Sequence, residues 1–579
     1  MSEKKRGFLH DTWRLAKPYW RSEDRWWAWG LLVAVVALNL TSVYISVRFN
    51  TWNRDFFNAI QQYDWEAFKY QFIVFGVIAA SAIVVTVYQI YLQQMLQIRW
   101  RRWLTRRYLD LWLDERAYYR LQLEGTGTDN PDQRISDDLD RFTRSSIALT
   151  IGTNGFLNAG VTLISFLGIL WGLSGSAAIP LGPLGEVEIP GYMVWFALVY
   201  AVGGTWLTFK IGRPLVRLNF DQQRYEADFR FSMVRLRENT ESVALYGGEG
   251  RERRNFIDRF GYVVGNFWSI MKRVKRLNWY TSGYTQVAIV FPYLVAAPRY
   301  FAKQISFGDL QQTADAFGQV QTSLSFIVNS YAEIAEWQSV VQRLSGFDRR
   351  ARDIAAAARA KQPIEVTRGG DGLAVDHLDV DLPDGSALLR GVTMAAAPGE
   401  FVLIAAPTGT GKSTLLRALA GIWPFGRGRV RIGEGRMLFV PQRPYLPLGS
   451  LRTALLYPEE DRAVEKERLE AVLREVGLGA FAGELDTVDN WAQRMSLGEQ
   501  QRLAFARILL SEPAIVFLDE ATSALDEKAE GALYALLRRA PWRPSVVSVG
   551  HRSTLREFHD RVLPLAAAGR EERTLPAAG

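Results

Sequence analysis

The chain has 579 residues, which is too long for a single hydrophobic core, so we expect two large units. The absence of cysteine excludes disulfides, thiolate metal sites and cysteine nucleophiles. The net charge is +8, and we attribute it to basic membrane-flanking loops rather than to nucleic-acid binding. Apolar and aromatic residues dominate the first half, whereas the sequence after residue 345 has the composition of a soluble domain.

The N-terminal 20 residues lack the cleavage pattern of a signal peptide. Apolar residues such as Phe8, Trp13 and Trp20 are mixed with Lys and Arg in this stretch. This mixture predicts an amphipathic helix in the membrane interface, and a frayed tail is the alternative.

Six windows of the first half are candidate membrane spans, since the hydrocarbon core requires about 20 helical residues. The sixth is the most polar and carries Glu333 and Glu336. Ionisable groups at membrane depth face the bundle interior, so we expect this span to face a watery cavity; a cytosolic helix is the alternative. The two glutamates lie on one helix side, which leaves open cargo binding, proton binding or a salt bridge. The windows are 27–49, 72–96, 147–173, 193–211, 280–301 and 317–337.

Loop charge predicts the orientation of these spans. Residues 99–120 and 212–276 are rich in Arg and Lys, whereas residues 174–191 contain neither. The positive-inside rule places the two basic segments in the cytoplasm, where we expect them to be helical extensions of the spans. With six spans, both termini are then cytoplasmic.

The composition changes after the sixth window. We expect a transmembrane domain over residues 1–345, a charged, Ala-rich linker over 346–362 and a soluble domain over 363–579. In the soluble domain the apolar runs EFVLIAA, GRMLFVPQ, AIVFLDE and SVVSVGH alternate with helical stretches. Such runs predict parallel strands that are buried on both faces, in an α/β domain.

The stretch APTGTGKST follows the first of these runs and opens a helix, which is the context of a phosphate-binding loop. Amides at a helix N-terminus attract phosphate, and we expect Lys412 to reach the β- and γ-phosphates and Ser413 to ligate Mg²⁺. Ala406 replaces the usual first glycine. Because Gly409 and Gly411 remain, we expect this change to adjust the turn without closing the site. The nucleotide-binding set expected here is Ala406, Pro407, Thr408, Gly409, Thr410, Gly411, Lys412, Ser413 and Thr414.

Two acids end the third apolar run. A buried strand that delivers Asp519 and Glu520 to its carboxyl end places them near the phosphate-binding loop. We expect Asp519 to hold Mg²⁺ and Glu520 to polarise the attacking water.

Further motifs follow in a fixed order: VPQRPYLPLG with Gln442, MSLGEQQR over 495–502, SALD over 523–526, and SVGHR with His551. Together they resemble an ABC transporter ATPase. The resemblance implies catalytic roles for Glu520, His551 and Gln442, and a metal set of Ser413, Gln442 and Asp519. It also implies a head-to-tail dimer, with ATP between Lys412 of one copy and the signature residues of the other. Those residues and their neighbours are Ser496, Leu497, Gly498, Glu499 and Asp526.

Besides Ala406, two further features depart from the usual ABC pattern. Leu497 replaces the first signature glycine, and we expect function to survive because its backbone amide remains. The stretch 373–399 contains no Phe, Tyr or Trp to stack on adenine, so Leu382, Pro383 or a residue elsewhere is a candidate for the base contact.

The sequence segments around these motifs resemble those of one group of ABC transporters. NPDQRISDDLDRF (130–142), RENTESVALYGGEGRE (237–252) and WLTRRYLDLWLDERAYYRLQ (103–122) are similar to the peroxisomal-type D subfamily and to the SbmA/BacA-like, YddA-type half-transporters. The first two segments are candidates for moving cytoplasmic helices, the alternative being solvated helices without a coupling role.

This resemblance implies an exporter-type fold of six transmembrane helices plus an α/β P-loop ATPase domain. It further implies ATP and Mg²⁺ as cofactors, a homodimer or heterodimer in a bacterial inner membrane with the ATPase in the cytoplasm, and no nucleic-acid partner. Related transporters import antimicrobial peptides, bleomycin-like glycopeptides or cobalamin, and the polar spans favour such hydrophilic cargo. Fatty acyl or other lipid-like cargo is the alternative. A membrane-tethered ABC ATPase and a sensor without net flux are the rivals from other classes.

Overall fold

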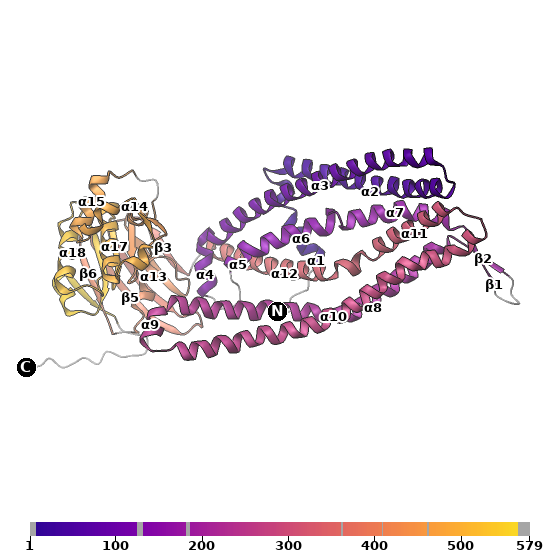
Figure 1. The fold of residues 1–579 in the computed structure, drawn as a ribbon. Coiled ribbons are helices and arrows are strands. Elements are labelled where there is room, and N and C mark those ends of the chain that lie inside the picture. Colours follow the sequence, from indigo (N-terminus) through magenta and orange to yellow (C-terminus); the bar gives the residue numbers. More distant parts are fainter. Residues whose placement is uncertain are drawn as a thin grey trace, which may run out of the picture. The chain divides into compact units, whose positions relative to one another are not determined.

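The computed structural model describes residues 7–123, 131–180, 186–360, 363–407, 409–459 and 463–565. The chain divides into two units (Figure 1). The helical unit comprises Met1–Asp114 and Gly127–Arg352, and the α/β unit comprises Glu115–Thr126 and Asp353–Gly579. A short segment from the middle of the helical half therefore groups with the α/β unit.

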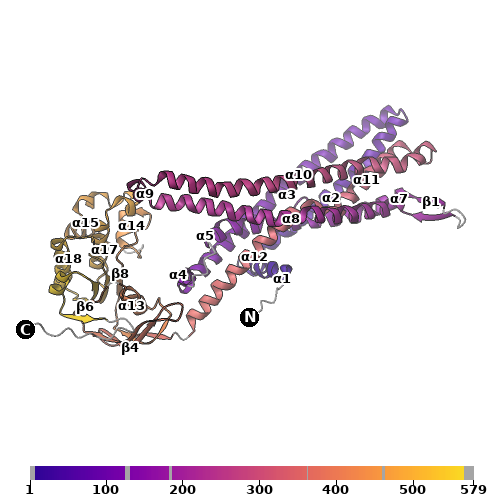
Figure 2. The same ribbon diagram turned by 90° about the horizontal axis from the view of Figure 1, so that it is seen from below.

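Long helices build the helical unit (Figures 1 and 2). Its elements are α1 (Phe8–Ala16), α2 (Arg25–Gln61), α3 (Trp65–Leu113), α5 (Pro131–Gln133), α6 (Leu139–Ile151), α7 (Phe156–Ser174), β1 (Ser176–Pro180), β2 (Glu186–Pro190), α8 (Tyr192–Glu238), α9 (Thr240–Leu245), α10 (Glu249–Phe301), α11 (Phe307–Leu324) and α12 (Phe326–Arg359). Helix α2 packs along α3, and α8 packs along α10. Phe166, Met193 and Phe317 belong to the buried cluster where α7, α8 and α11 meet.

Four helical stretches of the described residues are long and apolar enough to cross a membrane: Arg25–Gln61, Trp65–Leu123, Pro131–Ser174 and Tyr192–Glu238. They contain the first four expected windows. The fifth window lies on α10, which is strongly charged over its first half, and the sixth lies on α11 and α12. Both α10 and α11 pack against the apolar helices, so all six windows belong to one bundle.

Two of the expected spans are interrupted. The third breaks between α6 and α7, where the carbonyl of Ile151 accepts hydrogen bonds from Asn39 Nδ2 at 2.8 Å and Gln93 Nε2 at 3.2 Å. The sixth breaks at Ser325, whose hydroxyl lies 3.1 Å from the hydroxyl of Tyr284. Backbone groups released inside a membrane require partners, and at the first break the side chains of Asn39 and Gln93 provide one for the carbonyl of Ile151.

The α/β unit is built on a five-stranded parallel sheet of order β13-β6-β12-β11-β8. Its strands are β6 (Phe401–Ala405), β8 (Met437–Val440), β11 (Ile515–Asp519), β12 (Ser545–Gly550) and β13 (Arg561–Pro564). The four apolar runs form four of these strands, as predicted. Every residue of β12 is buried, as expected for a parallel strand covered on both faces.

A second sheet and several helices complete this unit. The sheet has the order β3-β7-β4-β5, with β3 (Ile364–Arg368), β4 (Leu373–Asp381), β5 (Ala387–Ala396) and β7 (Gly426–Ile432). The remaining elements are α4 (Ala117–Leu123), α13 (Lys412–Leu419), β9 (Gly449–Ser450), α14 (Leu451–Leu456), α15 (Lys466–Glu475), β10 (Val488–Asp489), α16 (Trp491–Arg494), α17 (Leu497–Ser511) and α18 (Glu527–Arg539). Leu123 of α4 packs against the apolar cluster between the sheets.

Candidate active site

The phosphate-binding loop connects β6 to α13. Gly409 has φ +83° and Gly411 has φ +100°, in the left-handed region that favours glycine. A Cβ on Gly411 would approach a methyl carbon of Leu388 to 2.8 Å, so this position also lacks space for a side chain. Thr408 lies outside the described residues. The two glycines therefore allow the turn that leads into α13, and the N-terminus of a helix is a site that favours anions.

Ala406 takes part in the loop through its backbone. Its carbonyl accepts a hydrogen bond from Lys412 Nζ at 2.7 Å, and Pro407 O accepts one from Thr410 Oγ1, also at 2.7 Å. Every residue type offers the carbonyl that Lys412 uses. This geometry explains how the loop forms although the first glycine of the motif is missing.

Lys412 lies at the centre of a charged group at the carboxyl end of the sheet. Its Nζ is 2.6 Å from Nε2 of His551, and that ring nitrogen is 2.9 Å from Oε1 of Glu520. Burial lowers the pKa of Lys412, and the carboxylates of Glu520 and Asp519 act in the opposite direction. Strands β6, β11 and β12 are neighbours in the sheet, which explains why their C-terminal residues meet.

Asp519 and Ser413 form the oxygen pair that the sequence predicts for Mg²⁺. Ser413 Oγ donates to Asp519 Oδ1 at 3.0 Å. Burial raises the pKa of Asp519, and the hydrogen bond from Ser413 opposes that shift. A hydroxyl and a carboxylate oxygen are ligands that Mg²⁺ accepts, so these residues fit the ion.

Glu520 is held from two sides. Gln442 Nε2 donates to Glu520 Oε2 at 3.1 Å, while His551 contacts the other carboxylate oxygen. The backbone of Glu520 has φ +49°, which is costly for a residue with a side chain and is typical of positions fixed by function. The three residues with predicted catalytic roles are thus in contact within one chain.

The signature segment forms the start of α17. Ser496 caps this helix and Glu499 closes a capping box, with Ser496 N donating to Glu499 Oε2 at 2.8 Å. Asp526 caps α18 by accepting from Ala529 N at 2.7 Å. Among the described residues, no hydrogen bond or ion pair joins Ser496 or Glu499 to the phosphate-binding loop.

Gln501 is a site residue that the sequence interpretation missed. Its side chain is fully buried and donates to the carbonyl of Gln442 at 2.9 Å and to Ser523 Oγ at 3.1 Å, while accepting from Ala524 N at 3.0 Å. Arg552 donates to the carbonyl of Ser523 at 2.9 Å. Gln501 thereby connects the signature helix, the Gln442 loop and the SALD loop. The only signal in the sequence is its place inside MSLGEQQR.

Leu382, a candidate contact for the adenine base, lies beside apolar side chains. Leu382 donates its amide to Ser386 O at 2.8 Å in the turn between β4 and β5, and its side chain packs on the buried cluster. Leu388, on β5, lies against the phosphate-binding loop at Gly411. The base contact itself stays a prediction, with Leu382, Pro383 or a residue elsewhere in the chain as candidates.

Comparison with known proteins agrees with this geometry. Residues 15–301 match the ABC transporter transmembrane region 2 family, and residues 389–523 match the ABC transporter family. The chain belongs to the ABC transporters. It is 34% identical to the chloroplastic ABC transporter D family member 2 of Arabidopsis thaliana, covering 96% of this chain and 86% of that protein. It is also 31% identical to the inner membrane ABC transporter ATP-binding protein YddA of Escherichia coli K12, over 96% of this chain and 97% of YddA.

A solved structure supports the same fold. The chain resembles a bacterial Atm1-family ABC exporter with ATP bound, with a TM-score of 0.69, 17% sequence identity and coverage of 92% and 93% of the two chains. The exporter-type fold with a membrane helical region and an α/β ATPase is therefore confirmed, as is the relation to the D subfamily and YddA. This ABC transporter couples ATP hydrolysis to transport. Its narrower assignment to the SbmA/BacA-like group stays a prediction.

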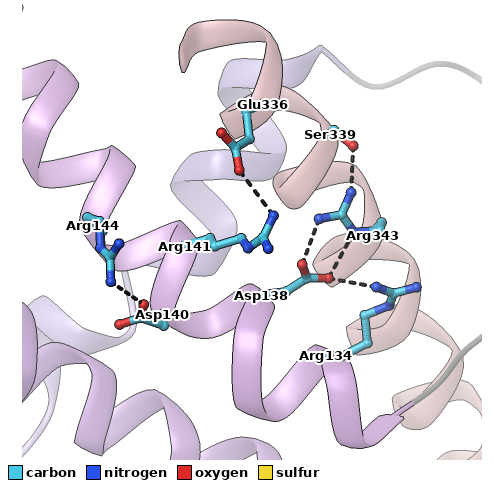
Figure 3. A network of polar contacts seen from close by, with 8 residues as sticks. All are labelled: Arg134, Asp138, Asp140, Arg141, Arg144, Glu336, Ser339 and Arg343. Atoms are coloured by element: carbon cyan, nitrogen blue, oxygen red, sulfur yellow. Dashed lines mark hydrogen bonds and ion pairs between the residues drawn. The ribbon is translucent and has the colours of Figure 1, made fainter. Parts of the chain in front are cut away.

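In the helical unit of this ABC transporter, an ionic network joins residues 134–144 to α12 (Figure 3). Asp138 ends a π-helical turn and is 2% exposed. Its carboxylate pairs with Arg134 at 2.8 Å. It also accepts hydrogen bonds from Nη2 and Nε of Arg343 on α12, at 2.6 and 2.9 Å. Nearby, Arg141 pairs with Glu336 at 3.1 Å. Of the roles left open for Glu336, the structure shows the salt bridge; Asn130 lies outside the described residues.

Proposed function

We propose that two copies of this chain form an ATP-driven transporter of polar cargo in a bacterial inner membrane. The observation that carries the proposal is the contact of Lys412, His551, Glu520 and Gln442 at one edge of the parallel sheet. Among the described residues, no hydrogen bond joins Ser496, in the signature segment, to this group within one chain. A second, oppositely oriented copy would bring its own Ser496 and Gly498 to the phosphates.

The proposed roles follow from the chemistry of each group. Lys412 and the amides of the phosphate-binding loop bind the phosphates of ATP. Glu520 accepts the proton of the attacking water, and His551 and Gln442 hold its carboxylate in place. Ser413, Asp519 and Gln442 would hold Mg²⁺, which neutralises charge on the transferred phosphoryl group.

A cavity within the helical unit favours polar cargo over lipid-like cargo. It measures about 710 Å³, and many of its lining side chains carry hydroxyl, amide or carboxylate groups. An acyl chain offers no hydrogen bond to the polar atoms of this lining that lack a partner, such as Asn50 Oδ1, and burying such atoms unsatisfied costs free energy. Peptides and other polar molecules satisfy them.

The test is uptake into lipid vesicles containing the purified protein, with ATP on the side of the ATPase domain. We expect Lys412→Ala and Glu520→Gln to abolish uptake of a polar peptide while leaving membrane insertion intact. Transport by both variants at the wild-type rate would refute the assigned site.

The direction of transport is tested in living cells. Deletion of the gene should make cells resistant to bleomycin and proline-rich peptides if the protein imports them. Increased sensitivity would instead show efflux.

A further inference from the structure

The cavity in the helical unit has one charged side chain in its lining. It is bounded by α2, α3, α7, α10 and α11, and its polar lining includes Ser46, Asn50, Asn53, Thr86 and Gln319. Asp315, on α11, is the single acidic or basic residue among the described lining residues. The two glutamates considered from the sequence, Glu333 and Glu336, are not part of this lining.

Asp315 has a neutral partner. Asn53 Nδ2, on α2, donates a hydrogen bond to Asp315 Oδ2. In the described part of the chain, no Lys, Arg or His side chain forms an ion pair with Asp315. A carboxylate at membrane depth is costly unless a positive charge or several hydrogen bonds compensate it. The structure gives Asp315 one hydrogen bond and, among the described residues, no cation to pair with, so a positively charged ligand would supply the missing partner.

Asn50 adds an unpaired acceptor to the same cavity. It is 5% exposed, and its Nδ2 donates to the carbonyl of Gln312 at 3.2 Å, which fixes the orientation of the amide. Its Oδ1 is buried and has no hydrogen-bond partner. Asn50 and Asn53 are three residues apart and share one face of α2. A buried acceptor without a partner is destabilising, so this oxygen favours a ligand that donates a hydrogen bond.

We propose that this cavity binds a positively charged group of the cargo, an ammonium or guanidinium, through Asp315 and Asn50. Asp315 supplies the opposite charge, and Asn50 Oδ1 accepts a second hydrogen bond from the same group. The inference rests on the proposed transport function and adds the charge of the cargo to it. The same carboxylate repels cargo that carries phosphate or carboxylate groups.

The test measures binding by the full-length protein in lipid nanodiscs. The probes are a short lysine-containing peptide and the same peptide with its lysines acetylated. We expect the wild type to bind the lysine peptide at least about tenfold more tightly, since charge-assisted hydrogen bonds are the strong ones. In Asp315→Asn this preference should disappear. Equal affinities for the two probes, or no binding of either, would overturn the proposal, as would a preference that survives Asp315→Asn.

Two further variants separate a binding role from a folding role. Asp55→Asn removes a carboxylate of α2 that pairs with Arg54 and lies outside the cavity, and it should keep the wild-type preference. Gln319→Glu adds a carboxylate to an exposed lining position one turn after Asp315. In the Asp315→Asn background it should restore the preference for the lysine peptide. Failure to restore it in a protein with normal ATPase activity would contradict the proposal.

Uptake distinguishes this proposal from the one on which it rests. Lys412→Ala should bind both probes like the wild type but fail to transport them. Preferential binding of the lysine peptide with ATP-independent uptake would reject the proposed function and keep the cation site. ATP-driven uptake that is equal for both peptides would reject the cation site and keep the proposed function.

Discussion

At the scale of single residues, the active site depends on which groups touch and through which atoms. Ala406 contributes a carbonyl to Lys412, whereas Glu520 contributes its carboxylate and an unusual backbone conformation. Gln501 contributes three hydrogen bonds that join separate loops. These differences lead to different expectations for substitution.

Replacement of Ala406 by glycine should change ATP hydrolysis less than about threefold. The Lys412 contact uses the backbone carbonyl, which Ala406→Gly preserves, and added flexibility in a loop costs roughly 0.5–1 kcal/mol. Phosphate release by the purified protein is the measurement. A change of orders of magnitude would show that the methyl group itself shapes the loop.

Replacement of Glu520 by glutamine should lower hydrolysis by about 10²–10⁴-fold and leave ATP binding intact, because the amide cannot accept the proton of water. Nucleotide binding and phosphate release are measured on the same preparation. Glu527→Gln, an exposed acid at the start of α18, is the matched control and should hydrolyse ATP like the wild type. Loss of ATP binding in Glu520→Gln would contradict the assigned role.

Replacement of Gln501 by leucine should lower both stability and hydrolysis. The carbonyl of Gln442 and the amide of Ala524 lose the side chain that bonds them, at about 0.5–1.5 kcal/mol for each lost hydrogen bond. Thermal unfolding and phosphate release report the two effects. Unchanged hydrolysis in a destabilised protein would mean that Gln501 only supports the fold.

At the scale of elements, the residues at junctions between helices and loops determine how neighbouring elements are connected in both units. Gly411 sets the turn from β6 into α13, and Asp138 ties the π-helical turn before α6 to α12 (Figure 3). Few other residue types can take the place of glycine or aspartate at these two junctions. Each junction is therefore tested by one substitution there and one control substitution of the same residue type elsewhere in the same unit.

Gly411→Ala should abolish ATP binding. The backbone at φ +100° strains any side chain, and the added Cβ would meet Leu388 at 2.8 Å. Gly483→Ala is the control because a Cβ there has no neighbour within 4 Å and its φ is not in the left-handed region. Binding of a fluorescent ATP analogue checks both variants; tight binding by Gly411→Ala would show that the loop can rearrange.

Asp138→Asn should destabilise the helical unit by about 3 kcal/mol, since it leaves Arg134 and Arg343 partly buried without their shared carboxylate. Thermal unfolding in detergent is the measurement. Asp132→Asn, an exposed acid in the same segment, should unfold like the wild type. Equal stability of the two variants would mean that the network contributes little.

At the scale of the whole molecule, one chain supplies one ATPase and one helical bundle. In the part of the chain that the structure describes, no hydrogen bond or ion pair joins Ser496 or Glu499 to the phosphate-binding loop. A head-to-tail pair of chains predicts complementation. Coexpressed Lys412→Ala and Ser496→Ala chains should form a dimer with one intact composite site and recover part of the ATPase activity that each variant lacks alone. Coexpressed Lys412→Ala and Glu520→Gln chains leave no intact site and should stay inactive. Equal activity of the two mixtures would contradict the shared site.

The sequence alone, through its local motifs, determines where most of the nucleotide-binding residues lie and that the first half forms helices. A strand, a glycine loop and a helix fix where Lys412 and Ser413 lie, and parallel strands bring Asp519 and His551 to the same edge of the sheet. The apolar windows and basic loops likewise indicate a helical membrane bundle. These conclusions hold because each depends on neighbours in the sequence or on the known edge of a parallel sheet.

Only the tertiary structure decided which distant residues meet. Gln501 reaches the Gln442 loop, Asp138 meets Arg343, and Asn53 of α2 meets Asp315 of α11, each across a long sequence separation. Periodicity can place a side chain on one face of a helix, but the partner depends on how the helices pack. For this reason the sequence singled out Glu336, which forms a salt bridge, and overlooked Asp315, which lines the cavity.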